Sequence, residues 1–129
     1  MPTVLVVDDN KQMADTIARM ATLLDWKAEI ALGSRSALEK IRRLQPQLIL
    51  LDMNMPGIDG GEVLKFVKRD PLLTRTAVVF ISAEGTPDVQ EKMRTLGALD
   101  YLLKPINLDQ LEAVFKKVLP PGNDQPKTP

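Results

Sequence analysis

The stretch QLILLDMNMPG, residues 47–57, gives the clearest indication of the fold. Its four consecutive apolar residues, Leu48 to Leu51, predict a strand that is buried on both faces, as in a parallel sheet. Asp52 ends this strand, and Pro56-Gly57 turns the chain away from the sheet directly afterwards. Open α/β sheets bind their ligands just beyond the carboxyl ends of the strands. The sequence therefore predicts that Asp52 lies at the ligand-binding edge of such a sheet.

Three further apolar runs, at residues 3–7, 77–81 and 99–103, and an alternating stretch at residues 26–31 predict the other strands. Each of the five strands is followed by apolar residues at helical spacing. A chain that alternates strand and helix five times predicts a mostly parallel sheet with helices on both faces. Helix starts are marked by cap signals. These signals are Asp9 or Asn10, a capping-box spacing at Ser36 and Glu39, Thr86-Pro87, and a second capping-box spacing at Asn107 and Gln110.

The length of 129 residues suits one domain with one core. We expect this domain to span residues 1–119, because residues 120–129 are rich in Pro, Gly, Asn, Gln and Lys and predict a flexible tail or the start of a linker. No apolar run reaches about 18 residues, and the N-terminus offers no signal peptide, so a cytoplasmic protein without a membrane segment is expected.

Charge and residue usage exclude several classes of function. Lys plus Arg and Asp plus Glu are balanced at 17 each, which argues against a sequence-independent grip on nucleic acid or anionic lipid. The chain has no Cys and no His, which excludes disulfides, structural zinc and Cys- or His-based nucleophiles. Any metal ion must be held by oxygen ligands, which favours a hard cation such as Mg²⁺.

The polar residues that need an explanation lie at the predicted strand ends: Asp8 and Asp9, Asp52, Ser82, and Lys104. If the first and third strands are neighbours, these side chains share one crevice. Two carboxylates about 4 Å apart repel by about 4 kcal/mol at an effective dielectric near 20, so three of them need a cation or must take up protons. A carboxylate, a divalent cation, a lysine and a hydroxyl together form a set suited to phosphoryl transfer.

Each of these residues also has a simpler explanation. A helix cap accounts for one of Asp8 and Asp9 but not for both. A turn role for Asp52 fits poorly, because a carboxylate after a buried strand is costly unless it is paired. Lys104 taken alone is a surface lysine, and Ser82 is routine after a strand. The phosphoryl-transfer interpretation depends on the combination rather than on any one residue. No Gly-rich phosphate loop is present, which argues against ATP as the direct phosphoryl donor.

These motifs resemble those of the receiver domain of two-component response regulators. The resemblance covers residues 3–119 and is carried by Asp8-Asp9, by Asp52 within its LLDMNMPG stretch, by Ser82-Ala83 and by Lys104-Pro105. It implies a doubly wound, flavodoxin-like (βα)5 three-layer sandwich with a parallel five-stranded sheet in the order 2-1-3-4-5.

The resemblance also implies roles for the site residues. Asp52 would accept a phosphoryl group, and Mg²⁺ (or Mn²⁺) would be held by Asp8, Asp9, Asp52 and the main-chain carbonyl of Asn54. Such a domain catalyses only its own phosphorylation and dephosphorylation, and is not otherwise an enzyme.

The same resemblance assigns the residues around the acceptor. Lys104 would pair with the phosphoryl oxygens, and Ser82 would hydrogen-bond to them. Tyr101, which in isolation reads as a core residue, would turn inward as the Ser82 hydroxyl moves. Asn54 and Glu84 occupy positions that tune how fast the phosphoryl group is lost. In this family the Lys104-Pro105 peptide is cis.

The implied partner is a sensor histidine kinase or a histidine phosphotransfer protein, with a downstream effector domain or protein and no direct nucleic-acid or membrane binding. The face formed by the fourth helix, fifth strand and fifth helix would change shape on phosphorylation and is also a candidate homodimer surface. The exposed residues expected on this face come from Asp88, Gln90, Glu91, Arg94, Lys116 and Lys117.

Three alternatives stay open at this point. A Mg²⁺ phosphohydrolase of the haloacid-dehalogenase type has a nucleophilic Asp after its first strand and a second Asp two residues later, where this chain has Asn10. The present chain of 129 residues is also too short to include the cap domain of such an enzyme. A flavin binder would need a hydroxyl-rich phosphate loop where Asp8-Asp9 stand. A degenerate receiver that serves only protein contacts is disfavoured by the complete set of five site residues.

Overall fold

The computed structural model describes residues 1–57 and 59–119. Strands and helices alternate along the chain: β1 (Thr3–Val7), α1 (Lys11–Leu23), β2 (Lys27–Ala31), α2 (Ser34–Leu44), β3 (Leu48–Asp52), α3 (Gly60–Arg69), the 3₁₀ turn η1 (Pro71–Leu73), β4 (Ala77–Ser82), α4 (Pro87–Thr95), β5 (Asp100–Leu103) and α5 (Leu108–Val118). The predicted tail, residues 120–129, lies outside the described residues. Among the helices described, none has the length and apolar character needed to cross a membrane.

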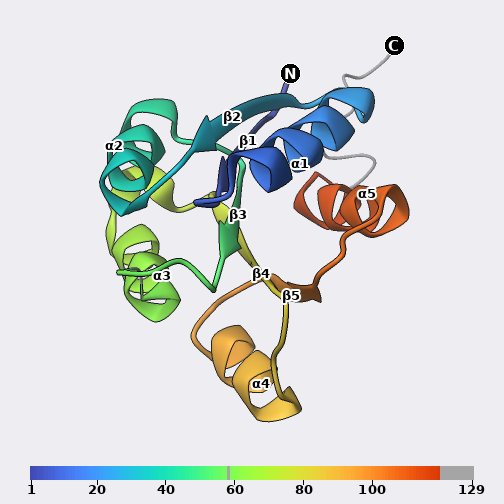
Figure 1. Cartoon of the computed structure of the whole chain (residues 1–129). Coiled ribbons are helices and arrows are strands. Elements are labelled where there is room, and N and C mark those ends of the chain that lie inside the picture. Colours follow the sequence, from blue (N-terminus) through green and yellow to red (C-terminus); the bar gives the residue numbers. More distant parts are fainter. Residues whose placement is uncertain (58, 120–129) are drawn as a thin grey trace.

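The five strands form one parallel sheet in the order β2-β1-β3-β4-β5, which confirms the predicted topology (Figure 1). All five residues of the central strand β3 are buried, as its unbroken apolar run predicts. The order changes direction between β1 and β3, because the chain first adds β2 on one side of β1 and then β3 on the other. The carboxyl ends of β1 and β3 therefore lie side by side at this switch point, where ligands of such sheets bind.

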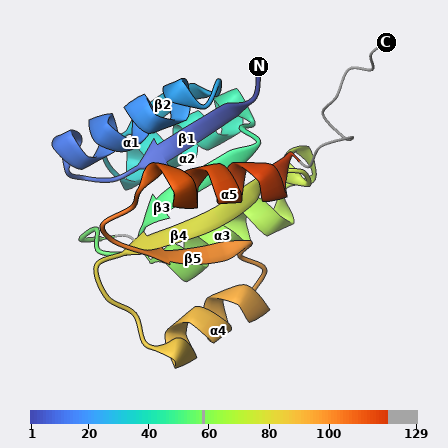
Figure 2. The ribbon, with the colours of Figure 1, turned by 90° about the vertical axis from the view of Figure 1, so that its right-hand side faces the viewer.

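Two apolar layers cover the sheet. Alternate strand residues such as Val4, Val6 and Leu50 pack with α1 and α5 on one face, and Figure 2 shows these two helices in front of the sheet. The other alternate residues, among them Leu5 and Leu51, pack with α2, α3 and α4. Burial on both faces holds the central strands, and with them the residues at their ends, in place.

Most predicted helix starts are observed, and one is wrong. Asn10 caps α1, Thr86 caps α4, and Asn107 forms a complete capping box with Gln110 at α5. The predicted capping box at Ser36 is not formed. The first bond of α2 runs from the Ala37 N–H to the carbonyl of Gly33 at 2.9 Å, so the helix begins at Ser34 and Ser36 already lies inside its first turn. The one-turn η1 after α3 was also not predicted; Asp70 caps it.

A carboxylate not singled out from the sequence joins α4, β5 and α5. Asp100, the first residue of β5, forms ion pairs with Arg94 of α4 at 3.0 Å and with Lys117 of α5 at 2.9 Å. It also accepts the N–H of Tyr101 at 2.8 Å. Burial alone would raise the pKa of Asp100, but the hydrogen bonds from Lys117, Tyr101 and Arg94 outweigh it and hold this pKa below its ordinary value.

Replacing Asp100 with Asn is expected to lower the free energy of unfolding by about 1–2 kcal/mol at pH 7, because two charge-assisted hydrogen bonds lose their acceptor charge. A lowered folded-state pKa contributes stability above the ordinary value of 3.8, and this contribution is lost as the pH falls through the lowered pKa. The deficit of the variant should therefore shrink in strong acid. Urea unfolding at pH 7 and pH 3 measures this loss of stability. Asp15→Asn is the control, because Asp15 forms an exposed ion pair with Lys11.

Candidate functional site

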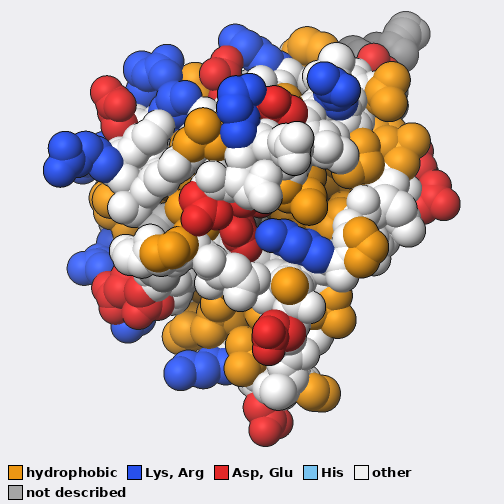
Figure 3. Space-filling model, in the orientation of Figure 1, with side chains coloured by type: hydrophobic (Ala, Val, Ile, Leu, Met, Phe, Trp, Pro, Cys, Tyr) orange, Lys and Arg blue, Asp and Glu red, His pale blue; other side chains and the backbone are white. Residues whose placement is uncertain are grey.

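Four strand ends bring the predicted site residues to one edge of the sheet. Asp8 directly follows β1, Asp52 ends β3, Ser82 ends β4 and Lys104 directly follows β5. Asp8, Asp52 and Ser82 are 1%, 3% and 2% exposed, so these polar groups are buried at the edge of the apolar core. Acidic side chains gather near the centre of the face seen in Figure 3, with basic side-chain atoms beside them.

The two buried carboxylates are held in the same way. The Asn10 N–H donates to Asp8 Oδ1 at 2.9 Å, and the Asn54 N–H donates to Asp52 Oδ1 at 3.0 Å. Both are turns in which an Asp side chain accepts the main-chain N–H two residues on. The pattern Asp-x-Asn occurs at both strand ends, and each turn fixes the orientation of its carboxylate.

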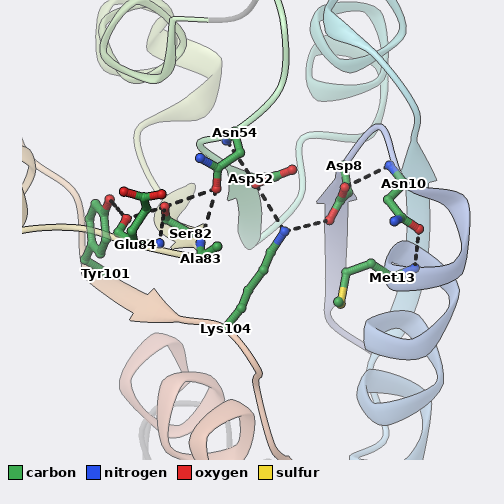
Figure 4. Close-up of polar contacts among 10 residues, drawn as sticks. All are labelled: Asp8, Asn10, Met13, Asp52, Asn54, Ser82, Ala83, Glu84, Tyr101 and Lys104. Atoms are coloured by element: carbon green, nitrogen blue, oxygen red, sulfur yellow. Dashed lines mark hydrogen bonds and ion pairs between the residues drawn. The ribbon is translucent and has the colours of Figure 1, made fainter.

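Lys104 reaches across this space. Its Nζ atom lies 3.4 Å from Asp52 Oδ1 and 3.8 Å from Asp8 Oδ2 (Figure 4). The Lys104 side chain is 19% exposed, so its charge is only partly screened by water. The peptide bond between Lys104 and Pro105 is cis. One ammonium group therefore faces both buried carboxylates.

Asp9 completes an acidic cluster with the two buried residues. Asp9 is exposed, and one oxygen from each of Asp8, Asp9 and Asp52 lies within 4.8 Å of the others. Burial raises the pKa of Asp8 above its ordinary value, and the charge of Asp52 adds to this, although the Asn10 N–H and Lys104 act in the opposite direction. Three carboxylates with one lysine leave excess negative charge. A set of oxygen donors with this excess fits a hard divalent cation such as Mg²⁺.

Ser82 and Ala83 present two hydrogen-bond donors beside Asp52, and both point at one atom. Asn54 Oδ1 lies 3.1 Å from Ser82 Oγ and 3.2 Å from the Ala83 N atom. The single hydroxyl proton of Ser82 also has a second acceptor, the carbonyl of Glu84. The Asn54 side chain thus holds an oxygen atom where a hydroxyl and an N–H converge, at the edge of the acidic cluster (Figure 4).

The Tyr101 ring lies inside the protein. Its side chain belongs to the apolar layer under α2, α3 and α4, the residue is 5% exposed, and its hydroxyl donates to the Glu84 carbonyl at 3.3 Å. The hydroxyls of Ser82 and Tyr101 therefore share one main-chain acceptor. Through this carbonyl the end of β4 is connected to the middle of β5.

The structure brings together nearly all the residues that the sequence singled out. Asp8, Asp9, Asp52 and Lys104 form one cluster, while Asn54, Ser82, Glu84 and Tyr101 form a connected hydrogen-bond chain next to it. Sequence reasoning missed the hydrogen bonds that the Asn54 side chain accepts from the Ser82 hydroxyl and the Ala83 N–H. The repeated Asp-x-Asn pattern could have predicted the two turns. No sequence pattern predicts that one main-chain N–H, such as that of Ala83, will act as a donor in the site.

Comparisons with known proteins agree with this arrangement. A family model described as the response regulator receiver domain matches residues 4–116. The chain is 31% identical over 117 residues to sporulation initiation phosphotransferase F of Bacillus subtilis, which covers 91% of this chain and 93% of that protein. It is 32% identical to the phosphate regulon transcriptional regulatory protein PhoB of Pseudomonas aeruginosa, over 91% of this chain but only 51% of that protein. It spans 25% of the regulatory protein AtoC of Escherichia coli.

Solved structures show the same fold. The chemotaxis protein CheY4 of Vibrio cholerae superposes with a TM-score of 0.84 at 28% identity, over 92% of this chain and 99% of that one. The signal receiver domain of a DNA binding response regulator from Colwellia psychrerythraea also gives a TM-score of 0.84, at 26% identity over 92% of this chain and 98% of that one. Coverage of 92% of this chain and of 98–99% of the two others means that the similarity extends over nearly the whole of each chain.

Proposed function

Since the chain belongs to the response regulator receiver domain family, we propose that Asp52 accepts a phosphoryl group from a phosphohistidine of a partner protein, in a reaction that requires Mg²⁺. The observation that carries this proposal is the convergence of Asp8, Asp9 and Asp52 within 4.8 Å, with Lys104 Nζ 3.4 Å from Asp52. The partner is a sensor histidine kinase or a histidine phosphotransfer protein, and the site of action is the cytoplasm.

In the proposed step an oxygen of the Asp52 carboxylate attacks phosphorus and forms an acyl phosphate. The bond from phosphorus to the donor's imidazole nitrogen breaks, and its electron pair stays on that nitrogen. Bound among Asp8, Asp9 and Asp52, Mg²⁺ would supply positive charge to the transferring phosphoryl group. The Asn54 N–H orients Asp52, and Lys104 neutralises charge that develops on the phosphoryl oxygens.

The Ser82 hydroxyl and the Ala83 N–H are the donors expected to receive a phosphoryl oxygen. Both donors now lie within hydrogen-bonding distance of Asn54 Oδ1, at 3.1 and 3.2 Å. A phosphoryl group on Asp52 would displace the Asn54 amide from these donors. This supports a tuning role for Asn54, because its side chain competes with the phosphoryl group for the same two hydrogen bonds.

Intact-mass measurement after incubation with Mg²⁺ and acetyl phosphate tests the proposed acceptor. The chain is expected to gain one phosphoryl group, and Asp52→Ala should gain none because the nucleophile is removed. Asp15→Ala serves as a matched control, since Asp15 lies on α1, pairs with Lys11 and is not a member of the acidic cluster. A phosphoryl group that persists in Asp52→Ala and disappears in Asp8→Ala would instead favour the phosphohydrolase alternative.

The proposed consequence is a change in the surface formed by α4, β5 and α5. When Ser82 turns its proton toward the phosphoryl group, Tyr101 becomes the sole hydroxyl donor to the Glu84 carbonyl. This exchange of hydrogen bonds shifts the loop before α4 between two positions, one for each state of Asp52. Of the residues expected on this surface, Asp88, Glu91, Arg94, Lys116 and Lys117 are exposed and Gln90 is half-buried. The surface would contact an effector or a second copy of the chain.

Chemical-shift mapping with beryllofluoride, which mimics a phosphoryl group, tests this surface. The largest changes outside the acidic cluster are expected at residues 82–85, at Tyr101 and along α4. Changes confined to α2 and α3 would contradict the assignment. The same spectrum of Asp52→Ala with beryllofluoride is the reference for shifts caused by the reagent alone.

A further inference from the structure

We propose that Gly85 sets the resting position of the Tyr101 ring, so that the surface formed by α4, β5 and α5 is held with the ring inside before any phosphoryl group arrives. The signalling consequence rests on the proposed function, whereas the position of the ring does not. Gly85 lies in the loop between β4 and α4, and it has no side chain.

The Tyr101 ring packs directly on the main chain at residue 85. A Cβ atom placed on Gly85 would lie 2.8 Å from Tyr101 Cε1, 2.8 Å from its Oη and 3.0 Å from its Cζ. Carbon atoms in van der Waals contact are about 3.5–4.0 Å apart, so even one methyl group is incompatible with the ring where it lies. The three nearest atoms all belong to the one side chain of Tyr101, which can move by rotation.

The backbone offers no other reason for a glycine at this position. Gly57 and Gly97 have φ angles of +77° and +114°, in the region that favours glycine. Gly85 is not among the described glycines with positive φ. The conformation of residue 85 is therefore open to alanine, and the missing side chain is explained by the close approach of Tyr101.

Two contacts hold the Tyr101 ring inside the protein, in the space that the absence of a side chain at Gly85 leaves open. It lies 6.2 Å from the Phe80 ring, centroid to centroid, with the planes tilted by 52°. Its hydroxyl donates to the carbonyl of Glu84, the residue directly before Gly85. A side chain at residue 85 would remove the ring from both partners, and the Glu84 carbonyl would keep only the Ser82 hydroxyl.

It follows that the size of residue 85 decides between two positions of Tyr101. Glycine admits the ring, which ties β5 to the loop that follows β4. Alanine or a larger residue would shift the ring toward solvent, and only a strong new contact elsewhere would return it. Gly85 therefore biases this domain toward the ring-inside arrangement before phosphorylation, whereas the family resemblance implies that Tyr101 turns inward only as the Ser82 hydroxyl moves.

Gly85→Ala in the unphosphorylated full chain tests the inference. Tyr101 is the only tyrosine, so ring-¹³C tyrosine labelling gives signals from one residue. The native protein should show nuclear Overhauser effects between the Tyr101 and Phe80 rings, and Gly85→Ala should lose them while its exposure to a soluble paramagnetic probe rises several-fold. Gly33→Ala is the matched control, since a Cβ there meets nothing within 4 Å, and it should leave the ring unchanged.

Retention of the Tyr101–Phe80 contacts in Gly85→Ala would overturn the inference. If Gly85→Ala lowers the unfolding midpoint, that loss should disappear when the same change is made in Tyr101→Ala; an undiminished loss would place the clash elsewhere and also overturn the inference. Phosphorylation by acetyl phosphate, measured on the same samples, separates the two claims. A chain that is never phosphorylated refutes the proposed function, while the ring data still decide the role of Gly85.

Discussion

Lys104→Met is expected to slow the phosphorylation of Asp52 by acetyl phosphate by about two orders of magnitude. The Lys104 ammonium lies 3.4 Å from the acceptor carboxylate and is the only cation within salt-bridge distance of Asp52 among the described residues. Its charge is directed at the place where phosphoryl oxygens gain charge in the transition state. Methionine retains the length of the side chain and removes the charge, so the change isolates electrostatics from packing.

The rate is followed by intact mass at fixed Mg²⁺ and acetyl phosphate. Lys116→Met is the matched control, because Lys116 is 67% exposed and, among the described residues, pairs only with Glu112 on the same helix. Lys104→Arg keeps the charge but replaces a compact ammonium with a planar fork, so an intermediate rate is expected. An unchanged rate in Lys104→Met, or an equal loss in the Lys116 variant, would refute the assigned role.

Asp8→Asn is expected to abolish most of the stabilisation by Mg²⁺ and, without Mg²⁺, to make the chain more stable by about 1–2 kcal/mol at pH 7. Burial raises the pKa of Asp8 in the folded state. A raised acid pKa means that folding is favoured below the ordinary value of 3.8 and that this advantage is lost as the pH rises through the folded pKa. At pH 7 the buried charge opposes folding, and Asn removes that charge while keeping the shape.

Thermal unfolding at pH 7 and pH 3, with and without Mg²⁺, measures both effects. In the metal-free protein the gain should be present at pH 7 and absent at pH 3, where Asp8 is protonated. In the native chain Mg²⁺ at a hundred times its dissociation constant should add about 2.7 kcal/mol, and Asp8→Asn should show little of this. A variant that Mg²⁺ stabilises as much as it does the native chain would remove Asp8 from the metal site.

The fold and the main site residues were predictable because both follow from local patterns. The buried run Leu48–Leu51 predicts its strand without reference to the rest of the chain, and β3 is buried throughout. Asp8, Asp52 and Lys104 then meet because parallel strands end at the same edge of a sheet. The strand order itself came from the family resemblance, since the alternation of strands and helices is compatible with several orders.

Features that depend on long-range contacts were not predictable. The Asp100 cluster joins residues 6 and 17 positions away along the chain, and each is an ordinary charged residue in its local context. From the sequence alone, Gly85 is an ordinary turn residue after a strand. Its close contact with the Tyr101 ring is seen only in the structure. The start of α2 was misplaced because Ser36 and Glu39 have the spacing of a capping box, whereas the first turn formed on the Gly33 carbonyl.

Borohydride reduction of the phosphorylated chain identifies the acceptor residue, because it converts an aspartyl phosphate to homoserine at the residue that carried the phosphoryl group. After incubation with acetyl phosphate and Mg²⁺, peptide mapping is predicted to find homoserine at position 52 and at no other aspartate, and to find none when Mg²⁺ is removed by a chelator. Homoserine at position 8 or 9, or equal labelling of Asp52 without Mg²⁺, would show that Asp52 is not the Mg²⁺-dependent acceptor.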